Sequence, residues 1–233
     1  MPCRCNDNDI VNYLKDRIEQ KIIPCLEKLN IFDTQNVFVY CLECRIPRQQ
    51  NQCPEIIVTP ISVRGCVVDK HKPGIYIVVG NPRLGSQCKQ NRNQTCQTNS
   101  TIIDIGSSKN LLRRFGYFIL ELKYNFCGKL HSTAQRIRQA ILNEYGSGSN
   151  TCLYIIGFPL EDNHKDKVRK VEGCFQEAHR DFFLSYPCCV DRPEEPDFNI
   201  FLIPPDEARR TIQFILTTID IFFRDCIQDC SPL

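Results

Sequence analysis

Apolar residues recur along this chain of 233 residues first at helical spacing and then in short strand-like runs. A spacing of three to four residues predicts a helix, whereas runs rich in Val, Ile, Phe and Tyr between turn residues predict strands. The chain therefore belongs to the mixed α and β class. Helices are expected over residues 9–29, from just after Gly106 to 122, 132–145, 166–183 and 206–230, and strands over 36–46, 55–68, 74–80, 101–106 and 151–158.

The helix expected after Gly106 carries two adjacent arginines. Ser107 or Ser108 is available as its N-cap, and its apolar residues fall on one side. Arg113 points away from the apolar stripe. Arg114 lies about 100° from the centre of the stripe, at the margin from which a side chain can lean into a neighbouring cleft.

One carboxylate interrupts the apolar stripe of the helix predicted at 166–183. Glu172 lies within the stripe, and His179 is two turns further along the same side. A buried carboxylate must be paired, protonated or bound to a cation, because burying an isolated charge is costly. Glu172 is therefore expected either to form a salt bridge with a basic neighbour or to bind a metal ion.

The composition excludes several classes of protein. The chain is 42% apolar and 24% charged, which is typical of a globular protein. Its longest apolar window, 214–223, falls short of the roughly 18 to 20 residues of a membrane-spanning helix, so no membrane partner is expected. The N-terminus lacks the apolar core of a secretory signal, which predicts an intracellular location, in the cytoplasm or the nucleus.

Positive charge is concentrated in one third of the chain. Twelve basic and two acidic residues lie between Lys70 and Asn143, a net charge of +10, whereas the rest of the chain carries −8. Such a segment is what a polyanion-binding face requires, although exposed helices also carry lysine and arginine.

The sixteen cysteines allow two interpretations. In a long chain without a signal peptide, most are expected to be thiols within apolar stretches, where cysteine acts as a small hydrophobic residue. The CxxC pair Cys41 and Cys44, with Cys53 and Cys66 downstream, could instead supply four thiolates to a structural Zn²⁺ site.

Two short motifs precede the helix that carries the adjacent arginines. The first motif is Gly74-Ile75-Tyr76, and the second is Asp104-Ile105-Gly106. The second motif is followed by the run Ser107-Ser108-Lys109-Asn110-Leu111 and then by Arg114. Together these residues resemble the GIY-YIG nuclease superfamily, which has a similar segment after its second motif. The similarity extends to the helix that contains Glu172.

The resemblance implies an α+β fold with a small three-stranded antiparallel sheet flanked by helices. The nuclease-like domain would cover residues 69–203. It would be preceded by a cysteine-containing α/β extension, residues 1–68, and followed by a C-terminal helix, residues 204–233.

The resemblance also implies roles for individual residues. Tyr76 would accept or relay the proton of the attacking water, Arg114 would hold the scissile phosphate, and Glu172 would bind one divalent cation, Mg²⁺ or Mn²⁺. Lys109 and Arg113 would join Arg114 in binding DNA. Because a tyrosine of normal pKa is a poor base at neutral pH, Arg114 or Lys109 would have to lower the pKa of Tyr76.

Two features depart from the family pattern. Asp104 replaces the tyrosine of the second motif, and a long polar insertion, 81–100, separates the motifs. An anion beside the phosphate repels it unless the carboxylate helps to hold the metal, and Asp104 is counted among the catalytic candidates with Tyr76, Lys109, Arg114 and Glu172.

The sequence thus predicts a metal-dependent endonuclease that hydrolyses DNA phosphodiester bonds. The alternative is a catalytically inactive module of the same fold that binds nucleic acid or protein, and a third hypothesis is a zinc-stapled interaction protein. The sequence does not indicate an oligomeric state.

Overall fold

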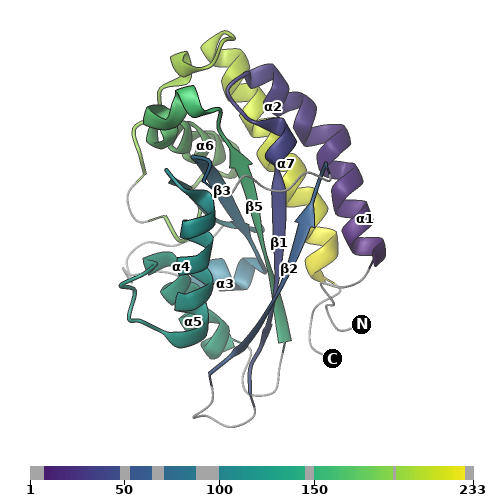
Figure 1. Cartoon of the computed structure of the whole chain (residues 1–233), viewed down its shortest axis with the longest axis vertical. Helices are drawn as coiled ribbons and strands as arrows, with labels where there is room; N and C mark the ends of the chain where they lie inside the picture. Colours follow the sequence, from purple (N-terminus) through teal and green to yellow (C-terminus); the bar gives the residue numbers. More distant parts are fainter. Residues whose placement is uncertain are drawn as a thin grey trace.

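The computed structural model describes residues 8–47, 53–64, 71–87, 100–144, 150–190 and 193–228, and its architecture is α+β (Figure 1). Its centre is one antiparallel sheet with the strand order β2-β1-β5-β3-β4. The strands are β1 (Phe38–Arg45), β2 (Glu55–Ser62), β3 (Gly74–Val79), β4 (Ile102–Ser108) and β5 (Asn150–Pro159).

The expected three-stranded sheet is wrong in strand number. β5, β3 and β4 are neighbours, but β1 pairs with β5 over its whole length and β2 pairs with β1. Strands from the predicted N-terminal extension therefore continue the sheet of the predicted nuclease domain. This pairing joins segments about a hundred residues apart, which local periodicity does not report.

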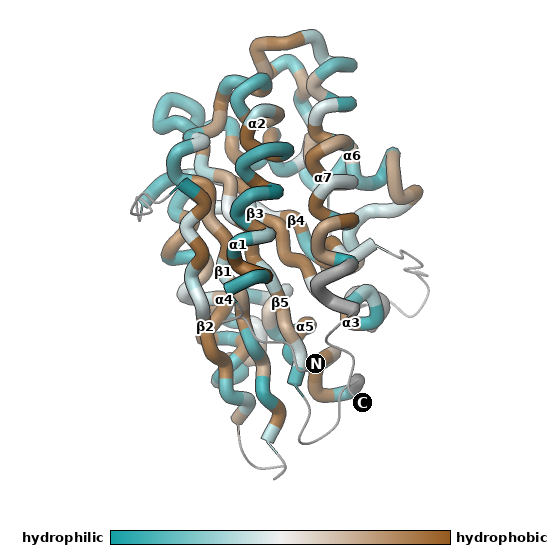
Figure 2. Tube along the Cα trace, turned by 90° about the vertical axis from the view of Figure 1, so that its right-hand side faces the viewer, coloured by the Kyte–Doolittle hydropathy of each residue, from teal (hydrophilic) through white to brown (hydrophobic). Residues whose placement is uncertain are grey.

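Helices cover both faces of the sheet (Figures 1 and 2). Successive side chains of a strand point to opposite faces, so Ile75 and Ile77 enter one core and Tyr76 and Val78 the other. The first core is completed by α1 (Asn8–Arg17), α2 (Ile23–Leu29), α6 (Val168–Phe183) and α7 (Pro205–Gln228), and the second by α3 (Pro82–Gln87), α4 (Leu111–Tyr124) and α5 (Ser132–Glu144).

The helix predicted at 9–29 is divided by a π-helical turn, Ile18–Ile22, between α1 and α2. Pro24 lies in the first turn of α2 and has no N–H to donate to the preceding turn. Asn30, with φ 54°, ends α2 in the left-handed conformation. The chain also forms short 3-10 helices at Thr34–Asn36, Asp162–Lys167 and Phe198–Ile200.

The N-cap of α4 differs from the expectation. β4 runs through Ser107 and Ser108, and Asn110 caps the helix by accepting a hydrogen bond from the Arg113 N–H at 2.9 Å. Ser108 Oγ instead accepts from the Asn110 N–H at 3.0 Å and donates to the Asn110 carbonyl at 2.9 Å, just before the helix.

Both edge strands of the sheet have backbone positions that cannot pair with a further strand. On β4, the Ile103 carbonyl accepts a hydrogen bond from the Cys189 N–H, and the Ile105 carbonyl accepts one from the Gln176 side chain, each at 2.9 Å. On β2, the opposite edge, Pro60 has no N–H. The groups that cover β4 also form the wall of the site described next.

Candidate active site

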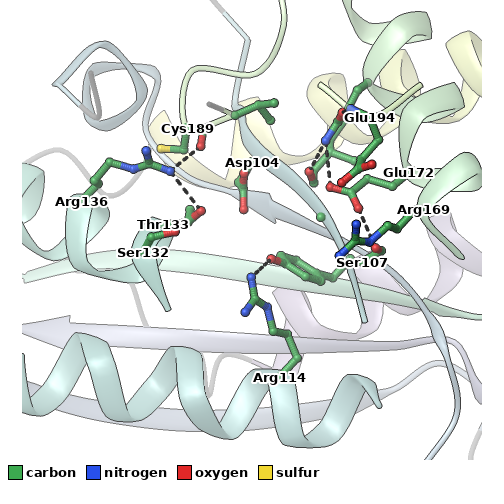
Figure 3. Close-up of a pocket in the computed structure, with 15 residues that line it drawn as sticks. Asp104, Ser107, Arg114, Ser132, Thr133, Arg136, Arg169, Glu172, Cys189 and Glu194 are labelled. Carbon is green, nitrogen blue, oxygen red and sulfur yellow. Dashed lines mark hydrogen bonds between the residues drawn. The ribbon is translucent and has the colours of Figure 1, made fainter. Parts of the chain in front are cut away.

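A cavity of about 590 Å³ lies against β4, between the start of α5, α4 and α6 (Figure 3). Its lining is largely polar and comes from segments far apart in the sequence. It is formed by Tyr76, Asp104, Ile105, Gly106, Ser107, Arg114, Ser132, Thr133, Arg136, Arg169, Glu172, Gln176, Cys189, Val190 and Glu194.

Tyr76 is fixed in the sheet beneath this cavity. Its cross-strand neighbours are Gly106 on β4 and Gly157 on β5. A Cβ at Gly106 would collide with the phenol ring and hydroxyl of Tyr76, so the glycine of the second motif makes room for the tyrosine of the first. The side chain also packs edge-on against Phe115, and only 2% of the residue is exposed.

The Tyr76 hydroxyl has two polar neighbours. Its Oη lies 3.2 Å from Nε2 of His131 and accepts a long hydrogen bond, 3.5 Å, from Nη2 of Arg114. The Ala134 N–H donates to Nδ1 of His131 at 3.4 Å, which favours the tautomer with the proton on Nε2. Both neighbours are then donors to Oη, so the phenolic proton is directed elsewhere.

Burial raises the pKa of Tyr76, and the charge on Asp104 raises it further, while Arg114 acts in the opposite direction. The expectation of a lowered pKa is therefore wrong, because loss of hydration outweighs the nearby guanidinium. Burial also lowers the pKa of His131 to about 3, so this imidazole is neutral at neutral pH.

Glu172 reaches the cavity from α6 and is held by two hydrogen bonds. Ser107 Oγ donates to Oε2 at 2.6 Å, and Gln176 Nε2 donates to Oε1 at 2.9 Å. Burial raises the pKa of Glu172 to about 7, against the effect of the Ser107 hydrogen bond, and Glu194 raises it too. The salt bridge considered for this residue is not found among the described residues.

Asp104 lines the same cavity and is fully buried within the sheet. Burial, followed by the charge on Glu172, raises its pKa to about 7, whereas Arg136, Arg114 and a hydrogen bond from Thr133 lower it. No basic side chain in the described part of the chain forms an ion pair with either carboxylate. Asp104 and Glu172 thus share the cavity with a third acid, Glu194, and neither of the two forms an ion pair with a described basic residue.

The positive side of the cavity is formed by Arg114, Arg136 and Arg169. Nη2 of Arg136 donates to the Cys189 carbonyl at 2.7 Å and to Thr133 Oγ1 at 3.4 Å, which fixes this guanidinium against the wall. Nε of Arg114 is buried without a hydrogen-bond partner. An unpartnered buried donor is costly, so an anionic ligand at this position would be stabilised.

The donor set fits a hard divalent cation. Mg²⁺ is commonly bound by one or two carboxylates, with water and substrate phosphate oxygens completing its coordination. Glu172 and Asp104 offer carboxylate oxygens and lack ion-pair partners, as described above. No group of three or more His, Cys, Asp or Glu side chains suited to a metal occurs among the residues that the structure describes.

Two of the residues expected at the site lie outside it. Lys109 and Arg113 are exposed and do not line the cavity; Arg113 stacks over Tyr117. Both residues come after β4, which ends at Ser108 and not at Gly106 as expected. His179 also lies apart from it: it is buried, and its Nδ1 is 2.7 Å from the Ser185 carbonyl.

Several residues of the site were not anticipated from the sequence, among them His131, Thr133, Arg136 and Gln176. Gln176 lies one helical turn after Glu172, and this spacing was a usable signal for a partner of the buried carboxylate. The sequence around the other three carries no signal for a site, because the start of α5 reaches the cavity only through the tertiary fold.

The predicted zinc ligands do not converge. Cys41 and Cys44 lie on opposite faces of β1, one in each core, because residues three apart in a strand point in opposite directions. Cys41 is disulfide-bonded, as are Cys188 and Cys189, whereas most cysteines in the described part of the chain, including Cys25, Cys127, Cys152 and Cys174, are thiols as expected. Cys53 is an exposed thiol, and Cys66 lies outside the described residues.

No protein-family model, curated protein or solved structure matches this chain. Within the described part of the chain, no helix has the length and apolar character needed to cross a membrane.

Proposed function

We propose that this protein is a metal-dependent endonuclease that hydrolyses DNA phosphodiester bonds. The observation that carries the proposal is the meeting of Tyr76 from β3, Arg114 from α4 and Glu172 from α6 in one cavity. These are the three positions at which the chain resembles the GIY-YIG nucleases, and they lie up to about a hundred residues apart in the sequence.

Arg114 is suited to hold the phosphate. Its guanidinium is always charged and offers parallel donors to two phosphate oxygens, and its buried Nε gains a partner when an anion binds. Arg136 and Arg169 add positive potential to the same cavity. This charge favours a pentacovalent transition state that carries more negative charge than the substrate.

The acidic residues divide between cation binding and proton transfer. Glu172, oriented by Ser107 and Gln176, would hold a divalent cation, which supplies charge stabilisation for the departing oxygen. Asp104 faces the same cavity and has a pKa of about 7, a value suited to accepting the proton of the attacking water near neutral pH. The replacement of the second tyrosine by Asp104 is then compatible with hydrolysis.

Tyr76 would act as a hydrogen-bond donor. Its raised pKa keeps the phenol protonated, and Oη already accepts from Arg114 and His131. The phenolic proton is therefore free to hold the attacking water or a phosphate oxygen, while His131 fixes the orientation of the ring.

A plasmid-nicking assay with Mg²⁺ tests the proposal. Wild type should convert supercoiled DNA to open circles, and Glu172→Gln should reduce the rate at least about 100-fold, because it removes the charge that holds the cation. Asp166→Asn, an exposed acid before α6, is the matched control and should cut like wild type. Equal rates for wild type and Glu172→Gln would contradict the assignment.

The burial of Tyr76 favours the second candidate, a module of this fold that binds nucleic acid without cleaving it. The hydroxyl of this residue is already engaged by two donors in a nearly inaccessible position. The same protein would then bind DNA with an affinity that falls steeply with salt, and no open circles would form in the nicking assay.

A further inference from the structure

The outer side of α4 carries an unusual row of exposed side chains. Residues at positions i, i+4, i+7 and i+11 of a helix form one stripe, and here the stripe does not face a core. Tyr117, Leu120 and Tyr124 are 37%, 40% and 50% exposed, and Phe126 just after the helix is 44% exposed. We call this row the α4 ridge; it consists of Arg113, Tyr117, Leu120, Lys123, Tyr124 and Phe126.

The ridge aromatics are not required by the fold. The opposite side of α4 supplies its buried residues, including Phe115, Phe118 and Leu122, to the second core. Exposed aromatic residues in such a row have a cost in water that a bound ligand would remove.

The exposed charge of α4 has one sign. Its one acidic residue, Glu121, is fully buried and accepts hydrogen bonds from the Gly128 and Leu130 N–H groups at 2.8 and 3.2 Å. The basic residues of the ridge stand over its rings: the Arg113 guanidinium lies 5.8 Å from the centre of Tyr117, and Lys123 Nζ lies 5.2 Å from that of Tyr124.

The ridge starts next to the cavity. Arg113 is adjacent in sequence to Arg114, which lines it, and the helical period places the ridge about a quarter turn from Arg114. With 14 residues, α4 extends about 20 Å from this point. A strand held by Arg114 could therefore continue along the ridge for several nucleotides.

We propose that the α4 ridge binds a single-stranded stretch of the nucleic acid next to the phosphate in the cavity, and this inference rests on the proposed function. Alternating aromatic and basic side chains suit unpaired bases, whose faces stack on the rings while their phosphates meet the cations. A duplex keeps its base faces covered and offers only phosphates to such a surface. Charge of one sign beside the rings also distinguishes the ridge from a typical protein interface, whose core is depleted of lysine.

Fluorescence anisotropy with a labelled 15-nucleotide oligothymidylate, in EDTA to prevent cleavage, tests the proposal. Tyr117→Ala/Tyr124→Ala should weaken binding about 10- to 100-fold, in line with the usual effect of removing a stacked aromatic. Tyr117→Phe/Tyr124→Phe should bind like wild type because the rings remain. Phe182→Ala/Phe214→Ala, which removes exposed aromatics from α6 and α7, should also leave binding unchanged.

A blunt duplex of the same length provides the discriminating comparison. The alanine pair should change its affinity less than threefold. Unchanged binding of the oligothymidylate, or an equal loss for both DNAs, would overturn the proposal. So would loss of binding to phosphatidylserine vesicles with normal oligothymidylate binding, which would identify the ridge as a membrane-surface contact.

The outcomes separate this inference from the endonuclease proposal. Ridge-dependent oligothymidylate binding without any nicking would support the ridge and reject the nuclease. Glu172-dependent nicking with normal oligothymidylate binding by the alanine pair would support the nuclease and reject the ridge.

Discussion

Each end of β4 contacts a carboxylate from a helix, and the two carboxylates have different partners. At the start of the strand, Asp220 of α7 accepts hydrogen bonds from the Ser100 and Thr101 hydroxyls and from the Thr101 N–H, and it forms an ion pair with Arg224 at 2.7 Å. At the other end, Glu172 of α6 has two hydrogen bonds and no ion-pair partner among the described residues.

The two acids differ in their partners as well as in their burial. Both interrupt the apolar pattern of their helices, but Asp220 is buried and Glu172 is partly exposed towards the cavity. Asp220 has a counter-charge within the protein and joins α7 to the sheet, whereas neither Glu172 nor Asp104 forms an ion pair among the described residues, which fits the cation site proposed for Glu172. The predictions below alter one side of this comparison at a time.

The largest expected effect is on stability and falls on Asp220. Asp220→Ala should lower the free energy of unfolding by about 3 to 5 kcal/mol, because it leaves the buried Ser100 and Thr101 hydroxyls and the Thr101 N–H without their acceptor. Glu172→Gln should not lower it, since no ion pair is lost. Urea denaturation of both variants measures the difference, and equal losses would remove the distinction between the two ends of β4.

Asp104→Asn is expected to raise the free energy of unfolding, by less than Asp220→Ala lowers it. The pKa of Asp104 is raised to about 7 in the folded protein, so its contribution to stability is present below about pH 4 and is lost as the pH rises through 7. In EDTA at pH 8, the variant should therefore be more stable than wild type by about 2 to 4 kcal/mol.

Measuring the stability of wild type and Asp104→Asn at lower pH, and with Mg²⁺ at pH 8, tests whether Asp104 is the titrating group. The stability gap should close towards pH 4, and Mg²⁺ held by Glu172 should narrow it at pH 8, because the cation also offsets the charge of the ionised Asp104, which the variant lacks. Asp166→Asn serves as the exposed control. A gap that does not depend on pH would show that Asp104 is not the titrating group.

The smallest effect is expected for Ser107→Ala. Its hydroxyl donates to Glu172 and favours the ionised carboxylate, so its removal should raise the pKa of Glu172 further. At pH 7 the variant should need about tenfold more Mg²⁺ to reach half of the thermal stabilisation seen in wild type, which corresponds to about 1 kcal/mol. An unchanged Mg²⁺ requirement would mean that Ser107 does not orient the cation ligand.

Periodicity predicted most elements of this fold because it records which side of each helix or strand is buried. The helix containing Glu172 and the strand containing Tyr76 are examples. The five-stranded sheet was not predicted, since the pairing of β1 with β5 depends on partners distant in the chain. The π-turn before Pro24 needed backbone geometry that the apolar pattern does not contain.

The candidate site was predicted in part for a similar reason. Tyr76, Arg114, Glu172 and Asp104 lie within motifs or interrupt an apolar pattern, and the structure brings them together. Arg136 is an ordinary basic residue of an amphipathic helix, and only the approach of α5 to β4 gives it a place at the cavity. Lys109 does not line the cavity, and its predicted contact with DNA stays a prediction.

The treatment of the sheet edges determines how copies of this protein can meet. An exposed edge is a template on which another chain can add a strand, and this leads to filaments or swapped assemblies. Pro60 interrupts one edge, and the Cys189 N–H and the Gln176 amide occupy carbonyls of the other. These features oppose growth of the sheet by strand addition at both of its edges.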